Sequence, residues 1–277
     1  MRVFQQGGLE IKYKVEGTSG PVYVLLHGFG GGPADWSVLA NKLSVTNRVV
    51  VPNLKVFFSH ADFLSFSRQI QFLSEFINEL YRRKGVHVLN LMGQSYGATL
   101  SLGVRLRGQF NVGQHVLINP MPFHPLVKVR DPQVKKLVQE SFAPGGIGSF
   151  LRTSDGREAL SELARVFRIG ALGTHEISHF NDRKMNLVER AFERFYQIDR
   201  SEDWTYWEHL LSALPEGAID RFFYSNEDSL FSKADYAQFA ARVKSREVHE
   251  IQHKGHLLIQ DLKNMDDSET RFEQLYL

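Results

Sequence analysis

The sequence feature that most constrains the fold is a short apolar segment that runs into a serine flanked by glycines. Residues 89–98 read Leu-Asn-Leu-Met-Gly-Gln-Ser-Tyr-Gly-Ala, which is typical of a buried strand followed by the start of a helix. A serine on so sharp a strand-to-helix turn has strained backbone geometry, and side chains at positions 93 and 97 would collide, so both positions require glycine. The pattern predicts that the Ser95 hydroxyl stands clear of a sheet, and that the Tyr96 backbone N–H begins a helix, where it can donate to an oxyanion.

A second glycine-rich segment, His27-Gly-Phe-Gly-Gly-Gly32, follows the apolar run of residues 22–26. Such a run is typical of a strand that is covered on both faces of a parallel sheet. The segment lacks both the G-x-G-x-x-G spacing with a downstream acid and the Lys-Ser/Thr ending of a phosphate-binding loop, so it does not indicate a nucleotide site. Two interpretations stay open: a tight turn after a strand, or a loop that brings the backbone N–H of Phe29 close to a reacting oxygen.

Strand and helix patterns alternate around these two loops. A loose alternation over residues 2–17, around Gly7-Gly8, predicts an opening hairpin, and apolar residues spaced by three or four over 62–83 predict an amphipathic helix. The rhythm predicts an α/β fold with a doubly wound, mostly parallel sheet and right-handed crossovers. Ligands of such sheets bind at the carboxyl ends of the strands, where both glycine-rich loops lie. We expect further strands at 22–26, 48–51, 86–92, 115–118, 220–225 and 247–251, and further helices at 96–107, 235–243 and 264–277.

The strand pattern stops from about Phe123 to Pro215, where helical patterns take over. A segment of roughly ninety residues is too long for a loop, so we expect a helical insertion that covers the active edge of the sheet. The predicted organisation is a core of residues 1–122 and 216–277 and a helical cap of residues 123–215.

A serine hydroxyl needs a base to take its proton, and a third group usually orients that base. Asp228 follows the strand pattern of 220–225, and the neighbouring acids Glu227 and Asp235 are its rivals. His256 follows the last strand pattern, with His253 as the alternative. We expect His27 to stabilise its own loop rather than to take part in chemistry.

With these residues the chain resembles the α/β-hydrolase superfamily over nearly its whole length outside the insertion. The likeness rests on His27-Gly28, Gly93-Gln-Ser-Tyr-Gly97, Glu227-Asp228 and Gly255-His256, in the chain order serine, acid, histidine. The resemblance implies that Ser95 is the nucleophile, His256 the general base and Asp228 its orienting acid. It also implies that the N–H groups of Phe29 and Tyr96 form an oxyanion hole and that residues 123–215 form the cap.

The chain departs from the family after the strand at 48–51. Many members carry an Asp-x-x-Gly-x-Gly-x-Ser run there, whereas this chain has Pro52-Asn-Leu-Lys-Val-Phe-Phe-Ser59. The resemblance therefore does not define the shape of this loop or its share of the pocket, although the departure leaves the three triad positions unaffected. A serine as nucleophile also argues against dehalogenase chemistry, for which the family uses a carboxylate.

The expected function is a serine hydrolase that cleaves a small-molecule carboxylic ester, or a related acyl substrate, through an acyl-Ser95 intermediate. The same triad also serves thioester, amide, lactone and carbon–carbon bond hydrolysis. An alternative from another class is a non-catalytic ligand-binding or interaction protein on the same scaffold, because a fold does not dictate a function. The sequence predicts no particular oligomeric state.

Composition and pattern exclude several other classes. The 33 Lys and Arg nearly balance the 31 Asp and Glu, and a net charge of +2 gives no field for nucleic acid. The absence of cysteine excludes thiol catalysis and cysteine zinc sites, and His175 and His179, spaced i, i+4, lack a third ligand, so we expect no cofactor or metal. No run reaches the roughly 18 to 20 apolar residues of a membrane span, and the amino terminus lacks the apolar core of a signal peptide. We therefore expect a cytoplasmic protein without membrane contact.

Overall fold

The computed structural model describes residues 1–28, 31–59, 64–83, 88–121, 208–228, 231–256 and 258–261. The predicted cap, apart from residues 208–215, and the predicted closing helix at 264–277 lie outside these ranges. Both stay predictions.

The chain opens with an antiparallel hairpin, as predicted. Strands β1 (Arg2–Gln6) and β2 (Leu9–Glu16) pair around Gly7 and Gly8. Both glycines have positive φ, 57° and 80°, which a residue without a Cβ adopts at no steric cost. The hairpin forms one edge of the sheet, and β2 joins it to the rest by pairing antiparallel with β4 (Arg48–Pro52).

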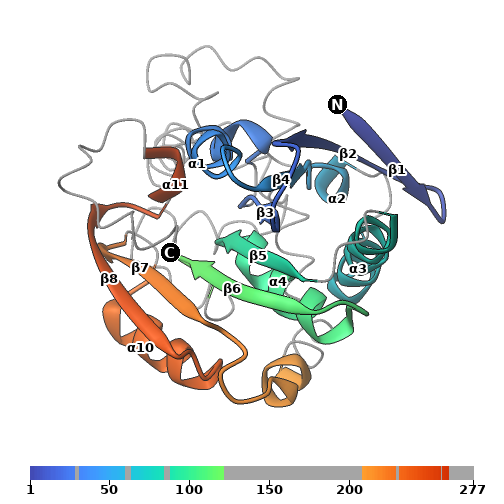
Figure 1. The fold of residues 1–277 in the computed structure, drawn as a ribbon. Coiled ribbons are helices and arrows are strands. Elements are labelled where there is room, and N and C mark those ends of the chain that lie inside the picture. Colours follow the sequence, from blue (N-terminus) through green and yellow to red (C-terminus); the bar gives the residue numbers. More distant parts are fainter. Residues whose placement is uncertain are drawn as a thin grey trace, which may run out of the picture.

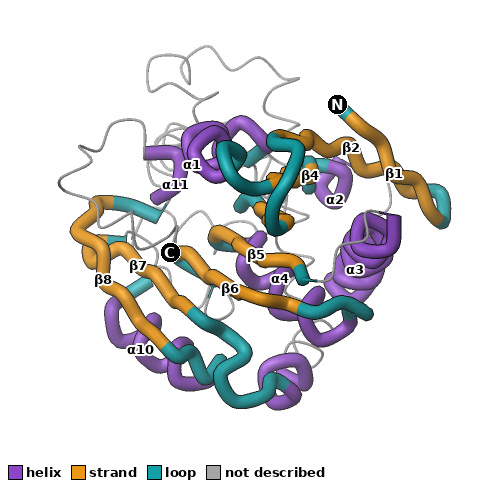
Figure 2. The backbone as a smooth tube through the Cα atoms, viewed as in Figure 1, coloured by secondary structure: helices purple, strands orange, loops and turns teal. Residues whose placement is uncertain are grey.

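Eight strands form one sheet in the order β1-β2-β4-β3-β5-β6-β7-β8, and every neighbouring pair from β4 onward is parallel. Figures 1 and 2 show these strands as a single twisted layer with helices on both sides. This confirms the predicted doubly wound, mostly parallel sheet. The remaining strands are β3 (Val22–Leu26), β5 (Leu89–Gln94), β6 (Val112–Ile118), β7 (Arg221–Glu227) and β8 (Glu247–Lys254).

Apolar side chains form a core on each face of the sheet. In β3, Val22, Val24 and Leu26 join one core while Tyr23 and Leu25 join the other, because successive strand residues point to opposite faces. The first core lies under α3 (Phe66–Arg83), α4 (Tyr96–Arg107) and α10 (Lys233–Arg242). The second lies under η1 (Pro33–Trp36), α1 (Ser37–Leu43) and α11 (Leu258–Asp261). No helix in the described part of the chain combines the length and apolar character needed to cross a bilayer.

Several boundaries differ from the sequence prediction. Strand β5 begins at Leu89 rather than at residue 86, because its pairing with β3 starts where Leu89 meets Val22. Helix α3 begins at Phe66 rather than at residue 62. The short helices η1, α1, α2 (Val56–Ser59) and α11 were not predicted, since segments of four to seven residues contain too few turns to show a helical period.

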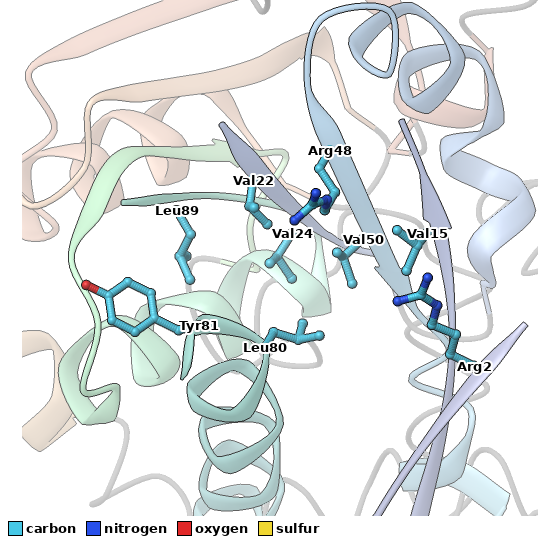
Figure 3. A pocket seen from close by; sticks show the side chains of 9 residues that line it. All are labelled: Arg2, Val15, Val22, Val24, Arg48, Val50, Leu80, Tyr81 and Leu89. Carbon is cyan, nitrogen blue, oxygen red and sulfur yellow. The ribbon is translucent and has the colours of Figure 1, made fainter. Parts of the chain in front are cut away.

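A narrow apolar crevice lies at the amino ends of the central strands (Figure 3). It is enclosed by the first residues of β3, β4 and β5 and by the last turns of α3. Ligands of doubly wound sheets bind at the opposite, carboxyl edge, which is therefore the expected location of the candidate site. The crevice is lined by Arg2, Val15, Val22, Val24, Arg48, Val50, Leu80, Tyr81 and Leu89.

Two histidines outside the triad positions, His27 and His115, are fully buried. His115 lies in β6, where its Nε2 is 2.7 Å from the hydroxyl of Ser101. Ser101 donates its proton to the Ala98 carbonyl, so the imidazole donates from Nε2 and leaves Nδ1 as an acceptor without a partner among the described residues. Burial, and secondarily the charge of Arg105, lowers the pKa of His115 from 6.5 to about 3. Burial likewise lowers the pKa of His27 to about 4.

These shifts predict that the protein loses stability as the pH falls below neutrality. Below pH 6.5 the unfolded chain binds protons at His27 and His115 that the folded chain does not bind, so the free energy of unfolding decreases. Each histidine is expected to cost about 2 kcal/mol between pH 7 and pH 5. Urea unfolding at both pH values measures this. In the variant His115→Gln, the free energy of unfolding should decrease less between pH 7 and pH 5, because the contribution of His115 is absent. If this decrease is as large in the variant as in the wild type, the lowered pKa of His115 is contradicted.

Candidate active site

Ser95 occupies the turn between β5 and α4, at the carboxyl edge of the sheet. Its backbone has φ 53° and ψ −121°, a conformation that non-glycine residues rarely adopt and that marks functional sites. A Cβ on Gly93 would lie 2.6 Å from backbone atoms of Ala98, and one on Gly97 would overlap the carbonyl oxygens of Leu26 and His27. The two glycines therefore allow the turn to close, as their spacing predicted.

The structure brings Ser95 together with the two other residues selected from the sequence. Nε2 of His256 is 2.7 Å from the Ser95 hydroxyl oxygen, and Nδ1 of the same ring is 2.7 Å from Oδ2 of Asp228. The three side chains are buried, with exposed fractions of 3% for Ser95, 3% for Asp228 and 0% for His256. They form a hydrogen-bonded chain from hydroxyl to carboxylate, which is the arrangement that lets an imidazole accept a serine proton.

Loops after the last two strands position the acid and the histidine. Asp228 directly follows β7, and its Oδ1 accepts a hydrogen bond from the Phe231 N–H at 3.2 Å. His256 follows β8 after Gly255, whose φ of 105° only glycine adopts readily. The Gly255 N–H donates to the Glu227 carbonyl at 3.0 Å, which ties the histidine loop to the end of β7.

Asn119 is a further residue at this edge that the sequence analysis did not assign to the site. It directly follows β6, has a positive φ of 40° and is fully buried. Its amide nitrogen donates to the backbone oxygen of His256 and to the hydroxyl of Ser225, both at 2.8 Å, and its amide oxygen accepts from the Ser225 N–H. One side chain thus fastens the histidine loop to β6 and β7. Its only signal in the sequence is an asparagine at the end of a predicted strand.

The second glycine-rich loop lies beside the serine. A Cβ on Gly28 would be 3.3 Å from the Cβ of Ser95 and 3.8 Å from its hydroxyl oxygen. His27 donates from Nδ1 to the Gly28 carbonyl at 2.8 Å and accepts at Nε2 from the Leu54 N–H at 2.9 Å. The histidine therefore braces this loop against the segment after β4, in the stabilising role expected of it.

Of the two predicted oxyanion donors, Tyr96 lies within the described residues and Phe29 does not. Tyr96 is the first residue of α4, where backbone amides point along the helix axis toward the serine end. Its ring is buried, and its hydroxyl donates to Gln69 of α3, which anchors the start of the helix. Phe29 lies outside the described residues, so its assignment stays a prediction.

The rival residues have other positions. Glu227 is exposed, and Asp235 accepts hydrogen bonds from the backbone N–H and hydroxyl of Ser232 at the start of α10. The side chain of His253 and the pair His175 and His179 lie outside the described residues. Within the described ranges no group of three or more acidic or histidine side chains could hold a metal ion.

Comparison with known proteins assigns the chain to a family. The model of the alpha/beta hydrolase family matches residues 23–266, which is most of the chain. The chain belongs to the alpha/beta hydrolase family. No curated protein matches it.

Solved structures agree with this fold over almost the whole alpha/beta hydrolase chain. An alpha/beta hydrolase fold protein from Burkholderia ambifaria is 18% identical with a TM-score of 0.65, and the match covers 95% of this chain and 94% of that one. The enol-lactonase from Burkholderia xenovorans LB400 is 15% identical with a TM-score of 0.60, covering 95% of both chains. Est816, described as an N-acyl homoserine lactone degrading enzyme, is 15% identical with a TM-score of 0.62, covering 95% and 96%. At such identities the likeness shows the shared fold.

Proposed function

We propose that this hydrolase cleaves a small-molecule carboxylic ester, a lactone included, through an acyl-Ser95 intermediate. The observation that carries the proposal is the hydrogen-bonded chain from Ser95 through His256 to Asp228, with both distances at 2.7 Å. The structural likeness to an enol-lactonase and to a lactone-degrading enzyme agrees with ester chemistry.

In the proposed acylation step, Nε2 of His256 takes the hydroxyl proton as the Ser95 oxygen attacks the carbonyl carbon. The carbonyl π bond becomes an oxyanion, which the N–H of Tyr96 and that of Phe29 would stabilise; losing one such donor typically raises the barrier by about 2.7 to 4 kcal/mol. When the oxyanion collapses, the bond to the leaving alkoxide breaks and Nε2 returns the proton to it. The acyl group is then esterified to Ser95.

Deacylation repeats these steps with water as the nucleophile. His256 takes one water proton, the hydroxyl adds to the acyl carbon, and the Ser95 oxygen leaves with the proton from Nε2. The products are a carboxylic acid and the unmodified serine. Throughout the cycle the buried Asp228 carboxylate orients the ring and stabilises the imidazolium that forms.

Trapping the intermediate tests this proposal. We expect the protein to release p-nitrophenol from a short p-nitrophenyl ester, and acid-quenched samples to carry one acyl group on the peptide that contains Ser95. A series of esters of graded chain length would then define the substrate class. Turnover with an acyl group on another residue, or with no acylated peptide under conditions where deacylation is slow, would reject the mechanism.

A further inference from the structure

A tyrosine on α10 contacts the same carboxylate oxygen that faces the histidine. The Tyr236 hydroxyl donates to Oδ2 of Asp228 at 2.6 Å, and Nδ1 of His256 is 2.7 Å from that same atom. The other oxygen, Oδ1, accepts from the Phe231 N–H at 3.2 Å. Rotation of an aspartate carboxylate about its terminal torsion is otherwise soft, so donors on both oxygens define its plane.

The side chain of Tyr236 lies in an apolar environment, where a hydroxyl group needs a hydrogen-bond partner. The residue is 0% exposed, and its ring packs against those of Phe222, Tyr224 and Phe231 with centroids 5.2 to 6.1 Å apart. Phenylalanine would fill such a site without a polar group to bury, and a buried hydroxyl costs stability unless it is hydrogen-bonded. The oxygen of Asp228 is the partner that offsets this cost.

The Tyr236 hydroxyl is held in its protonated form. Burial raises the pKa of Tyr236 well above 10, and the nearby charges of Asp228 and Asp235 raise it further. Among the described residues, the titratable groups that act on Tyr236 are Asp235 on its own helix, Tyr224 on β7 and Asp228 after β7, and Asp228 in turn contacts His256 after β8. At neutral pH Tyr236 therefore acts as a hydrogen-bond donor to the carboxylate oxygen that also faces the histidine.

We infer that Tyr236 is a positioning residue that holds the Asp228 carboxylate in the orientation in which Oδ2 faces His256. The inference rests on the proposed function, because it assigns Asp228 the role of orienting acid. The hydroxyl also draws charge at Oδ2 toward itself. Without it, more negative charge faces the imidazole, and the His256–Asp228 pair holds a proton more tightly.

The test compares Tyr236→Phe with Tyr224→Phe. The second variant is a matched control, because the Tyr224 hydroxyl contacts Glu250 at 2.9 Å and its ring stacks on that of Tyr236. We expect Tyr236→Phe to lower kcat/KM for a p-nitrophenyl ester about ten-fold and to move the acid limb of its pH profile upward by about half a pH unit or more. A profile that coincides with that of Tyr224→Phe would overturn the inference, because a purely structural tyrosine changes stability without moving the limb.

Two further measurements keep the inference testable if Tyr236→Phe does not fold or if no ester is turned over. Replacing Tyr236 by 3-fluorotyrosine keeps the ring but strengthens the donor, so the acid limb should move to lower pH. In histidine-labelled protein, the NMR signal of the Nδ1 proton of His256 reports on the Asp228 contact without any substrate. A shift of that signal on changing Tyr236 but not Tyr224 supports the positioning role even if ester hydrolysis fails; no shift refutes it even if hydrolysis succeeds.

Discussion

Replacing Ser95 by alanine is expected to reduce turnover of a p-nitrophenyl ester by about 10,000-fold or more, leaving only the residual catalysis that substrate binding and the oxyanion hole provide. The reason is that the hydroxyl oxygen is the atom 2.7 Å from the imidazole and the only part of the side chain that Ser95→Ala removes. The Cβ stays in place, so the strained turn between β5 and α4 keeps its shape. Steady-state kinetics with wild-type and variant protein measure the loss.

A control separates loss of the nucleophile from loss of a buried hydroxyl in general. Ser74 lies buried in α3 and donates to the Ile70 carbonyl at 2.7 Å, within its own helix. Ser74→Ala should keep kcat/KM within about two-fold of wild type. Turnover that survives in Ser95→Ala, with thermal unfolding unchanged in both variants, would exclude Ser95 as the nucleophile.

Replacing Asp228 by asparagine is expected to lower kcat by about 1,000- to 10,000-fold. An asparagine amide has one oxygen and one NH₂ group, so it cannot accept from Phe231 on one side and from His256 and Tyr236 on the other. If the NH₂ group faces His256, it forces the wrong ring tautomer, and Nε2 can no longer accept the serine proton. The loss should appear in kcat, with KM nearly unchanged.

Glu227→Gln provides the comparison for this substitution, because it removes an adjacent, exposed carboxylate. We expect its kcat to stay within about two-fold of wild type. If kcat falls equally in Asp228→Asn and Glu227→Gln, turnover depends on negative charge near the end of β7 rather than on the hydrogen bond between Asp228 and the imidazole.

Much of this fold was predictable because its signals are local in the sequence. The run 22–26 contains only residues that suit burial on both faces, and in the sheet it supplies both cores. The glycines at 93 and 97 specify one turn within five residues. Ser95, Asp228 and His256 follow strands, so their convergence at the carboxyl edge follows from parallel topology. Their catalytic roles remain the prediction that the experiments above address.

The features that escaped prediction depend on contacts between distant segments. Tyr236 lies within an ordinary amphipathic pattern, and only the packing of α10 on β7 turns its hydroxyl toward Asp228. Asn119 joins three segments through one amide, a role that no spacing in the chain reveals. The start of β5 at Leu89 is set by its pairing with β3. The sequence does not reveal this start, because apolar residues occur both before and after Leu89.

Covalent labelling by a fluorophosphonate probe tests the central claim most directly, because the probe reacts with a serine that a neighbouring base activates and needs no knowledge of the substrate. We predict one probe per chain, located by peptide mass spectrometry at Ser95, with labelling absent in Ser95→Ala and much slower in Asp228→Asn. A folded protein that binds ligands but takes up no probe, or takes it up at another residue, would contradict the account.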